Sequence, residues 1–194
     1  MKNKLKILSI CGSPRKGNSE AILYRLKEIL EKKGIKNEII LLREKNIQGC
    51  RGCVEYCNRN LKCWQKDDMA EIMKKMIKAH GYIFAIPNYF GMPPGLFKDF
   101  IDKCSIFYTA QTDLTSKRAL VISVGTDLPL IKENIQNIVK NFCNTLKIKV
   151  VTEGAFISRS ELKGNYNDIF ENKLNPNIEK ELEKMVDKLC ISLK

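Results

Sequence analysis

The sequence predicts an α/β protein in which helices cover both faces of a parallel sheet. Five short apolar runs recur along the chain, and segments with helical spacing of apolar residues separate them. Strands that read as continuous apolar runs are typical of parallel sheets buried on both faces. A chain of 194 residues, 44% of them apolar, is also long enough to bury a core of this kind.

The first half of the chain supplies three strands and two helices. In order, the predicted elements are a strand at residues 5–10, a helix at 19–33, a strand at 38–42, a helix that Asp67 or Asp68 caps, and a strand at 82–86. We expect Gly34 to end the first helix, because glycine readily adopts the left-handed conformation that follows a helix.

The second half continues the alternation. It supplies a helix at residues 96–107, a strand at 119–124, a helix at 130–146, a strand at 150–157 and a helix at 177–193. The polar stretch 159–176 is unassigned, either a solvated loop or an arm that faces a partner. Right-handed crossovers favour a flavodoxin-like three-layer α/β/α sandwich with a five-stranded parallel sheet in the order 2-1-3-4-5. We expect residues 1–194 to form a single domain with a cysteine-rich insertion at about 48–66, named here the cysteine-rich segment.

The formal net charge of +12 bears on possible partners. The lysines are scattered among glutamates along every predicted helix, which favours a solvated surface over a nucleic-acid-binding face. No apolar run approaches the length needed to span a bilayer, and the N-terminus has no signal-peptide pattern. We therefore expect a cytoplasmic protein that binds neither nucleic acid nor membrane.

The loop after the first predicted strand, residues 11–19, has the composition of an anion-binding turn. Its glycines allow close approach of a ligand to the backbone, its serines offer hydroxyl donors, and a helix N-terminus follows. It lacks the sequence patterns of nucleoside-triphosphate and dinucleotide loops, so a terminal phosphate monoester suits it best. The alternative is a plain turn with a serine cap. The candidate ligands are Ser13, Arg15, Gly17, Asn18 and Ser19.

Two further loops follow strands at the same predicted edge of the sheet. The loop at residues 87–95 holds three prolines, which stiffen it, so that the remaining backbone amides could face a ligand and its aromatic residues could flank a flat ring. Aromatic residues that pack into the core are the alternative. The third loop begins at Gly125. The candidate residues are Pro87, Asn88, Tyr89, Phe90, Gly91 and Gly125.

Cysteine usage is the other unusual feature. The chain has eight cysteines, and four of them, Cys50, Cys53, Cys57 and Cys63, lie within the cysteine-rich segment. In a reducing compartment such clustering indicates metal or redox chemistry. A 4Fe–4S cluster, a zinc ion, and cysteines that serve as small apolar residues on a helix face all remain open. The other four are expected in the core, and the single histidine, His80, at a helix end.

Several motifs occur together in order along residues 5–126. They are Gly12-Ser13-Pro14-Arg15 with Gly17-Asn18-Ser19, then Cys50-x2-Cys53, Cys63 and Lys66-Asp67-Asp68-Met69, then Pro87-x-Tyr89-Phe90-Gly91, and Leu96-x-Lys98-x-Phe100-Ile101-Asp102-Lys103. In combination they resemble the NADPH-dependent FMN reductase family, and within it the iron–sulfur flavoproteins.

The resemblance implies FMN at the nominated edge of the sheet. Residues 13, 15, 18 and 19 would hold its ribityl phosphate, residues 87–91 would line its ring, and Gly125 would lie nearby. NAD(P)H would be the electron donor, and no acid–base catalytic residue is needed because the flavin supplies the chemistry. Homodimers or homotetramers, and a redox partner protein, are also implied.

The resemblance also implies a 4Fe–4S cluster, with one departure from the family pattern. The spacing here is C-x2-C-x3-C-x5-C, one residue longer between Cys53 and Cys57 than in the iron–sulfur flavoproteins. Two other functions therefore stay open: a flavodoxin-like electron carrier without its own NAD(P)H turnover, and a zinc-bearing interaction domain. The basic charge argues mildly against the electron carrier.

Overall fold

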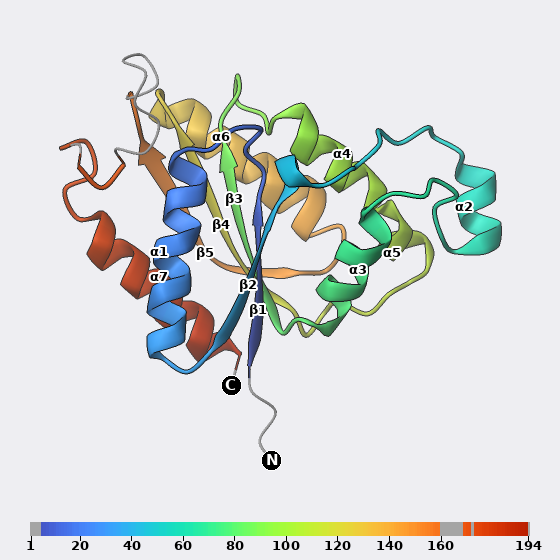
Figure 1. The fold of residues 1–194 in the computed structure, drawn as a ribbon, viewed down its shortest axis with the longest axis horizontal. Coiled ribbons are helices and arrows are strands. Elements are labelled where there is room, and N and C mark those ends of the chain that lie inside the picture. The colour runs from blue at the N-terminus through green and yellow to red at the C-terminus, as the bar shows by residue number, and fades with distance from the viewer. Residues whose placement is uncertain (1–4, 160–168, 172, 194) are drawn as a thin grey trace.

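The computed structural model describes residues 5–159, 169–171 and 173–193. Its five strands form one parallel sheet in the order β2-β1-β3-β4-β5, so the predicted flavodoxin-like topology is confirmed (Figure 1). The strands are β1 (Lys6–Cys11), β2 (Lys36–Leu41), β3 (Gly81–Pro87), β4 (Arg118–Gly125) and β5 (Lys149–Ile157).

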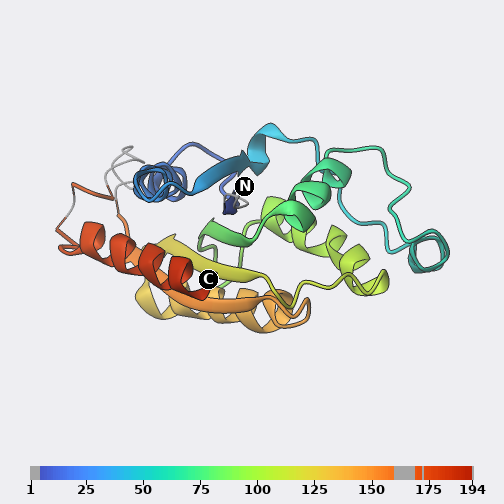
Figure 2. The same ribbon diagram turned by 90° about the horizontal axis from the view of Figure 1, so that it is seen from below.

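Helices cover both faces of the sheet and complete the three layers (Figures 1 and 2). One face packs against α1 (Asn18–Lys32) and α7 (Ile178–Ser192), the other against α3 (Met69–Lys78), α4 (Gly95–Lys103), α5 (Ser105–Thr109) and α6 (Leu128–Ile138). Side chains alternate between these two cores, as successive strand residues must: Ile7 packs towards α1, and Leu8 packs on the opposite face.

The first helix ends as predicted. Gly34 has a φ of +72°, its N–H donates to the Glu31 carbonyl at 2.9 Å, and the N–H of Ile35 donates to the Leu30 carbonyl at 3.0 Å. This pair of hydrogen bonds is the Schellman motif, in which a left-handed residue lets the chain turn back to satisfy the last carbonyls of a helix.

Two predicted helices differ from the structure. The helix expected at residues 96–107 is divided at Cys104 into α4 and α5. The helix expected at 130–146 begins earlier, at Leu128, because the Asp127 side chain accepts the N–H of Leu130 at 3.0 Å, and after α6 it continues only as a π-helical turn, η2 (Val139–Cys143). The spacing of apolar residues predicts neither difference, because the apolar face of each helix continues to be buried across it.

At the start of α3 the two aspartates have different roles. Asp68 occupies the N-cap position, yet its carboxylate accepts the N–H of Asn46 at 2.9 Å and makes no bond to α3. Asp67 instead accepts the N–H of Met69, the first residue of the helix, at 3.1 Å.

The segment between β2 and α3 is where the fold departs from a bare alternation of strand and helix. It contains a 3-10 turn, η1 (Leu42–Glu44), and a short helix, α2 (Val54–Asn60), within the cysteine-rich segment. In both views α2 lies at the right-hand edge of the molecule, beyond α3 and α5 (Figures 1 and 2). Of the unassigned stretch 159–176, residues 160–168 and 172 lie outside the described residues.

Across the part of the chain that the structure describes, no helix combines the length and the apolar character needed to cross a bilayer.

Candidate functional site

The loop after β1 is held close to the sheet by a glycine. The N–H of Gly12 donates to the Ala85 carbonyl at 2.9 Å. A Cβ atom on Gly12 would lie 2.7 Å from a ring carbon of Phe97, closer than a real side chain tolerates. Glycine at this position therefore lets the loop pass beneath Phe97 and turn towards α1.

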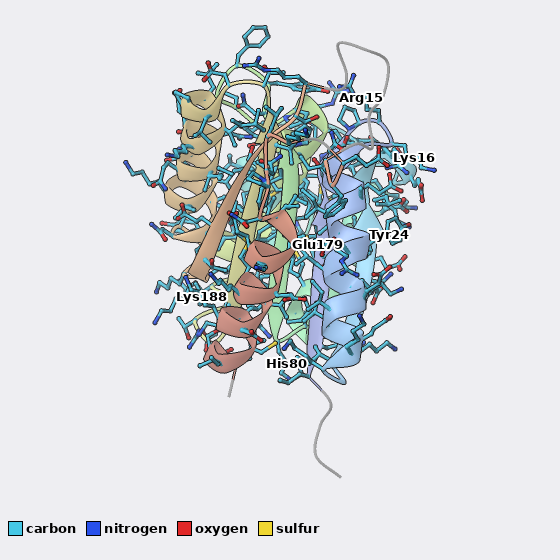
Figure 3. All side chains as sticks on the ribbon, turned by 90° about the vertical axis from the view of Figure 1, so that its left-hand side faces the viewer. Arg15, Lys16, Tyr24, His80, Glu179 and Lys188 are labelled. Carbon is cyan, nitrogen blue, oxygen red and sulfur yellow. The ribbon has the colours of Figure 1, made fainter. Side chains whose placement is uncertain are left out.

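Ser13 and Arg15 fix the next turn of the loop. The Ser13 hydroxyl donates to the Arg15 carbonyl at 2.7 Å, and the Arg15 N–H approaches the same hydroxyl at 3.4 Å. Ser13 is buried and the Arg15 side chain is exposed at the carboxyl-end edge of the sheet, where Figure 3 also shows its neighbour Lys16. His80, a residue just after α3, lies at the opposite end of the molecule (Figure 3).

Gly17 is the N-cap of α1, and its carbonyl accepts the N–H groups of Glu20 and Ala21 at 3.1 and 3.0 Å. The cap makes no side-chain hydrogen bond, so the alternative of a serine cap is wrong. The N–H groups of the first helical turn have no carbonyl one turn earlier, and together with the helix dipole they favour an anion at this end.

The end of β1, the start of α1 and the loops after β3 and β4 enclose a pocket of about 80 Å³. It is lined by Ser13, Arg15, Gly17, Asn18, Ser19, Pro87, Asn88, Tyr89, Val124, Gly125, Thr126 and Ser158. The structure thus brings together all the predicted cofactor residues except Phe90 and Gly91. Val124, Thr126 and Ser158 were not predicted. Ser158 directly follows β5. Because the carboxyl ends of all parallel strands lie at one edge of the sheet, this position could have been predicted from the sequence.

Asn18 connects this pocket to the end of the sheet. Its amide nitrogen donates to the Ser158 hydroxyl at 2.7 Å, and its amide oxygen accepts the N–H of Ile169 at 3.0 Å. The N–H of Ser158 in turn donates to the Gly125 carbonyl at 2.7 Å. The side chain expected to hold a phosphate is therefore engaged within the protein, where it joins α1 to the segment that follows β5.

The loop after β3 is a tight hairpin turn. The N–H of Asn88 donates to the Val124 carbonyl at 2.7 Å, while Tyr89 and Met92 exchange backbone hydrogen bonds of 2.9 and 3.0 Å. The Asn88 side chain accepts the N–H of Gly91 at 3.0 Å. The expectation that the amides of this loop face a ligand is therefore wrong for Asn88, Tyr89 and Gly91, because the turn itself uses them.

Phe90 and Gly91 form the tip of that turn and point away from the pocket. Both have a positive φ, +54° and +76°, as a two-residue hairpin turn requires. Phe90 is 95% exposed, so the alternative of packing into the core is wrong for it, and its role against a flavin ring stays a prediction. Gly91 faces α6, where a Cβ would lie 2.8 Å from a Glu133 carboxylate oxygen and where Asn137 donates to its carbonyl at 3.0 Å.

A partly buried ion pair lies beside the first loop and was not predicted. Glu20, in the first turn of α1, is 5% exposed, and Arg43 of η1 approaches its carboxylate at 2.8 Å. Hydrogen bonding to Glu20 raises the pKa of the Arg43 guanidinium. The pair cancels a negative charge that would otherwise oppose an anion next to the helix N-terminus.

The four cysteines of the cysteine-rich segment are neighbours at the surface. Cys50 is exposed and Cys53, Cys57 and Cys63 are half-buried. Partial burial and then the proximity of Cys53, Cys63 and Cys50 raise the pKa of the Cys57 thiol. The indole N–H of Trp64 lies 3.2 Å from the Cys53 sulfur.

As arranged in this structure, these thiols do not form a metal site. Among the described residues, no three His, Cys, Asp or Glu side chains are close enough together to hold a metal ion. Only Cys57 lies within α2, however, and this helix buries none of its residues. The alternative that Cys50, Cys53 and Cys57 are small apolar residues on one helix face is therefore wrong. The assignment of a metal to them stays a prediction.

The remaining cysteines behave as core residues, with one partial exception. Cys11, Cys104 and Cys143 are buried, and Cys190 is half-buried. Burial raises the pKa of the Cys11 thiol to about 11 and that of Cys143 to about 12. Both access and thiolate fraction are therefore low at these positions.

Alkylation should separate the two groups of thiols. When the cofactor-free native protein is treated with iodoacetamide at pH 8, we expect the cysteines of the cysteine-rich segment to react and Cys11, Cys104 and Cys143 to stay unmodified. Peptide mass spectrometry measures each site, and the same reaction in guanidinium, where all eight should react, is the control. Rapid modification of Cys11 in the native protein would contradict the burial of this residue at the end of β1.

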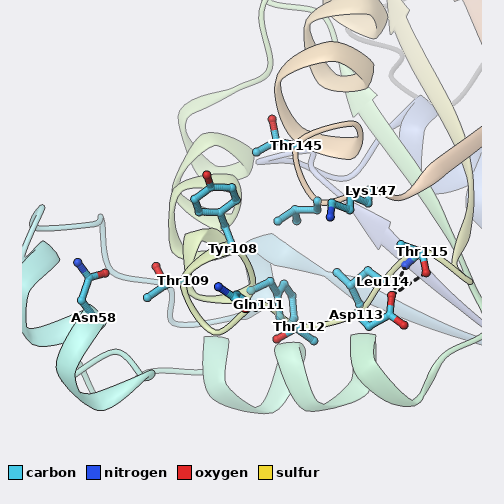
Figure 4. A pocket seen from close by; sticks show the side chains of 12 residues that line it. Asn58, Tyr108, Thr109, Gln111, Thr112, Asp113, Leu114, Thr115, Thr145 and Lys147 are labelled. Carbon is cyan, nitrogen blue, oxygen red and sulfur yellow. Dashed lines mark hydrogen bonds between the residues drawn. The ribbon is translucent and has the colours of Figure 1, made fainter.

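A larger hollow lies elsewhere on the described surface. It measures about 780 Å³ and is formed by α5, the loop before β4 and the segment before β5, with Asn58 of α2 at one side (Figure 4). Its one carboxylate, Asp113, already accepts the N–H and hydroxyl of Thr115 at 3.0 and 2.6 Å. No helix N-terminus or converging set of charges points into it, so the small pocket at α1 is the better candidate.

The strand order, with a pocket at the switch between β1 and β3, is that of a flavodoxin-like fold, a kind of fold in which ligands bind at the carboxyl edge of the sheet. The chain belongs to the NADPH-dependent FMN reductase family, which residues 5–162 match.

Known relatives are consistent with this membership. The chain is 33% identical over 122 residues to an iron-sulfur flavoprotein of Archaeoglobus fulgidus (62% of this chain and 62% of that protein). It is also 33% identical over 122 residues to one of Methanosarcina thermophila (62% and 63%). The matches thus span less than two thirds of these relatives. An NAD(P)H:quinone oxidoreductase from Methanothermobacter marburgensis superimposes with a TM-score of 0.69 at 15% identity, covering 98% of this chain and 96% of that one, and shares the fold.

Proposed function

We propose that the protein is an FMN-binding oxidoreductase, a single domain of residues 1–194, that passes electrons from NAD(P)H to an acceptor. The observation that carries this proposal is the pocket at the N-terminus of α1, which Ser13, Arg15 and Ser19 line together with the first backbone groups of that helix. This donor set suits a dianionic phosphate monoester such as the one that ends FMN.

The lining of the pocket supports a division of the ligand into two parts. Ser13, Arg15 and Ser19 lie at the start of α1 and would face the phosphate, and the other wall comes from the loops after β3 and β4. The isoalloxazine ring would lie on the open side, against Pro87, Asn88 and Tyr89. Gly125 allows these two loops to approach, since a Cβ there would lie 3.0 Å from the Asn88 Cβ.

The four cysteines of the cysteine-rich segment are the proposed ligands of a 4Fe–4S cluster. Their thiols lie within fourteen residues of one another, are exposed or half-buried, and are carried on a segment with two left-handed residues, Gly52 and Leu61, which would let the backbone wrap around a ligand. When bound, FMN supplies two-electron chemistry with NAD(P)H and the cluster supplies single-electron transfer to a partner. The chain's own residues position both groups, and none is required as an acid or base.

The proposal includes assembly and location. The nearly complete exposure of Phe90, next to the candidate flavin pocket, supports a homodimer or homotetramer that covers this turn. Eight free thiols support a cytoplasmic protein, where cysteines stay reduced.

An anaerobic preparation tests the proposal directly. We expect a brown protein that contains flavin and about four iron atoms per chain for the cluster, with no stoichiometric zinc, and whose flavin absorbance near 450 nm bleaches on addition of NADPH or NADH. Visible spectra measure the flavin and its bleaching, and metal analysis of the same sample measures iron and zinc. A protein that holds FMN but never oxidises NAD(P)H would be an electron carrier, and one with zinc and no flavin would be an interaction domain.

A further inference from the structure

The cysteine-rich segment leaves and rejoins the protein through a short neck, defined here as residues 46–49 and 65–68. Asn46 and Asp68 are linked twice: the Asp68 N–H donates to the Asn46 carbonyl, and the Asp68 carboxylate accepts the Asn46 N–H, both at 2.9 Å. The two ends of the segment are therefore held side by side.

Gln65 closes the neck from within. Only 7% of this residue is exposed. Its amide nitrogen donates to the Gln48 side chain at 3.1 Å and to the Gly49 carbonyl at 3.3 Å, and its amide oxygen accepts the Cys63 thiol at 3.7 Å. Because Gly49 directly precedes Cys50, these bonds bring the first and last cysteines of the motif to the same end of the segment.

One ion pair joins this neck to the rest of the protein. Lys103 of α4 contacts the Asp67 carboxylate, and their side chains are only 2% and 1% exposed. The same carboxylate accepts the N–H groups of Gln48 at 2.9 Å and Met69 at 3.1 Å. Asp67 thus fixes the start of the segment, the start of α3 and the side of α4 at one point, on the wall of a cavity of about 320 Å³ that Cys63 also lines.

The charge state of Asp67 agrees with this geometry. Burial alone raises the pKa of a carboxyl, but the hydrogen bonds from Lys103 and from the Gln48 and Met69 N–H groups outweigh it and leave the Asp67 pKa below its ordinary value. The Asp67 carboxylate is therefore ionised at neutral pH, and loss of Lys103 would leave this buried charge uncompensated.

We propose that Asp67 and Lys103 are positioning residues for the cysteine site, because their buried ion pair fixes the neck on α4 and thereby sets the separation of Cys50 and Cys63. This inference rests on the proposed iron–sulfur function. Neither residue needs to touch the metal, since both act through the neck. The pair also joins two motifs, 36 residues apart, that the candidate flavin pocket does not use.

Lys103→Met tests the anchor, with Lys98→Met as the matched control. Lys98 lies on the same helix and pairs with Asp102 at 2.6 Å, but it is exposed. We expect Lys103→Met to lower the ratio of iron to FMN at least fivefold and to speed tryptic cleavage within the cysteine-rich segment at least fivefold. FMN content should stay within twofold of the wild type. Lys98→Met should change none of these.

Two further variants separate anchoring from folding. Lys103→Arg, which keeps the charge, should recover at least half of the iron. Asp67→Asn combined with Lys103→Met removes both charges, so it relieves the buried-charge penalty without restoring the tie to α4, and it should stay low in iron and quickly cleaved.

Equal iron-to-flavin ratios and equal cleavage in Lys103→Met and Lys98→Met would overturn the proposal, as would a parallel loss of FMN and iron with a lower melting temperature. If the wild type contains no iron, the proposed cluster fails instead. The cleavage measurement needs no cofactor and still decides whether the pair anchors the neck.

Discussion

Replacing Ser13 and Arg15 together by alanine is expected to weaken FMN binding by about 100-fold. Arg15 would contribute charge-assisted hydrogen bonds to the phosphate and Ser13 a neutral one, which together are worth about 3 kcal/mol at a partly exposed site. The Ser13 hydroxyl has a single proton, which it donates to the Arg15 carbonyl at 2.7 Å, so this hydroxyl would turn to the phosphate when FMN binds. Flavin fluorescence titration of the cofactor-free protein measures the affinity.

Riboflavin makes this measurement specific for the phosphate. It carries the same ring without the anion, so its affinity should be nearly equal in the wild type and the double variant. Lys16→Ala removes an exposed neighbouring cation that does not line the pocket and should change FMN affinity less than threefold. Unchanged FMN affinity in the double variant, or an equal loss for riboflavin, would contradict the assignment of this loop to the phosphate.

Replacing any one of Cys50, Cys53, Cys57 and Cys63 by serine is expected to remove the iron. Each thiolate would hold one corner of the cluster, and a single missing ligand leaves an iron open to solvent in a segment that is already half-exposed. We expect iron to fall by about tenfold or more, with the brown colour changing to the yellow of flavin. Anaerobic purification followed by iron analysis and visible spectroscopy measures both changes.

Cys190→Ser is the matched control for this series. Cys190 is also half-buried, but it lies on α7, outside the cysteine-rich segment, and its loss should leave both iron and colour unchanged. FMN content should also persist in all four variants, because the candidate phosphate loop lies on a different part of the sheet edge. A variant of the four that keeps its full iron content would remove that cysteine from the ligand set, and zinc in place of iron would contradict the cluster.

Much of the candidate site followed from the sequence because its residues are local to strand ends. A parallel sheet collects the carboxyl ends of its strands at one edge, so the loops after β1, β3 and β4 had to meet once the strands were recognised. Phe90 and Gly91 lie outside the lining of this pocket for a local reason. The sequence showed a stiff turn, but not that its two central residues take positive φ and carry the aromatic ring outward.

The sequence by itself determined the layers, the strand order and the grouping of the four cysteines, because apolar periodicity records which face of each element is buried. Only the tertiary structure decided which distant polar groups meet: Asn18 with Ser158, 140 residues apart, and Asp67 with Lys103. A pattern along the chain shows that a polar side chain sits at a buried position. Its partner depends on how separate elements pack, and burial then makes that pairing obligatory.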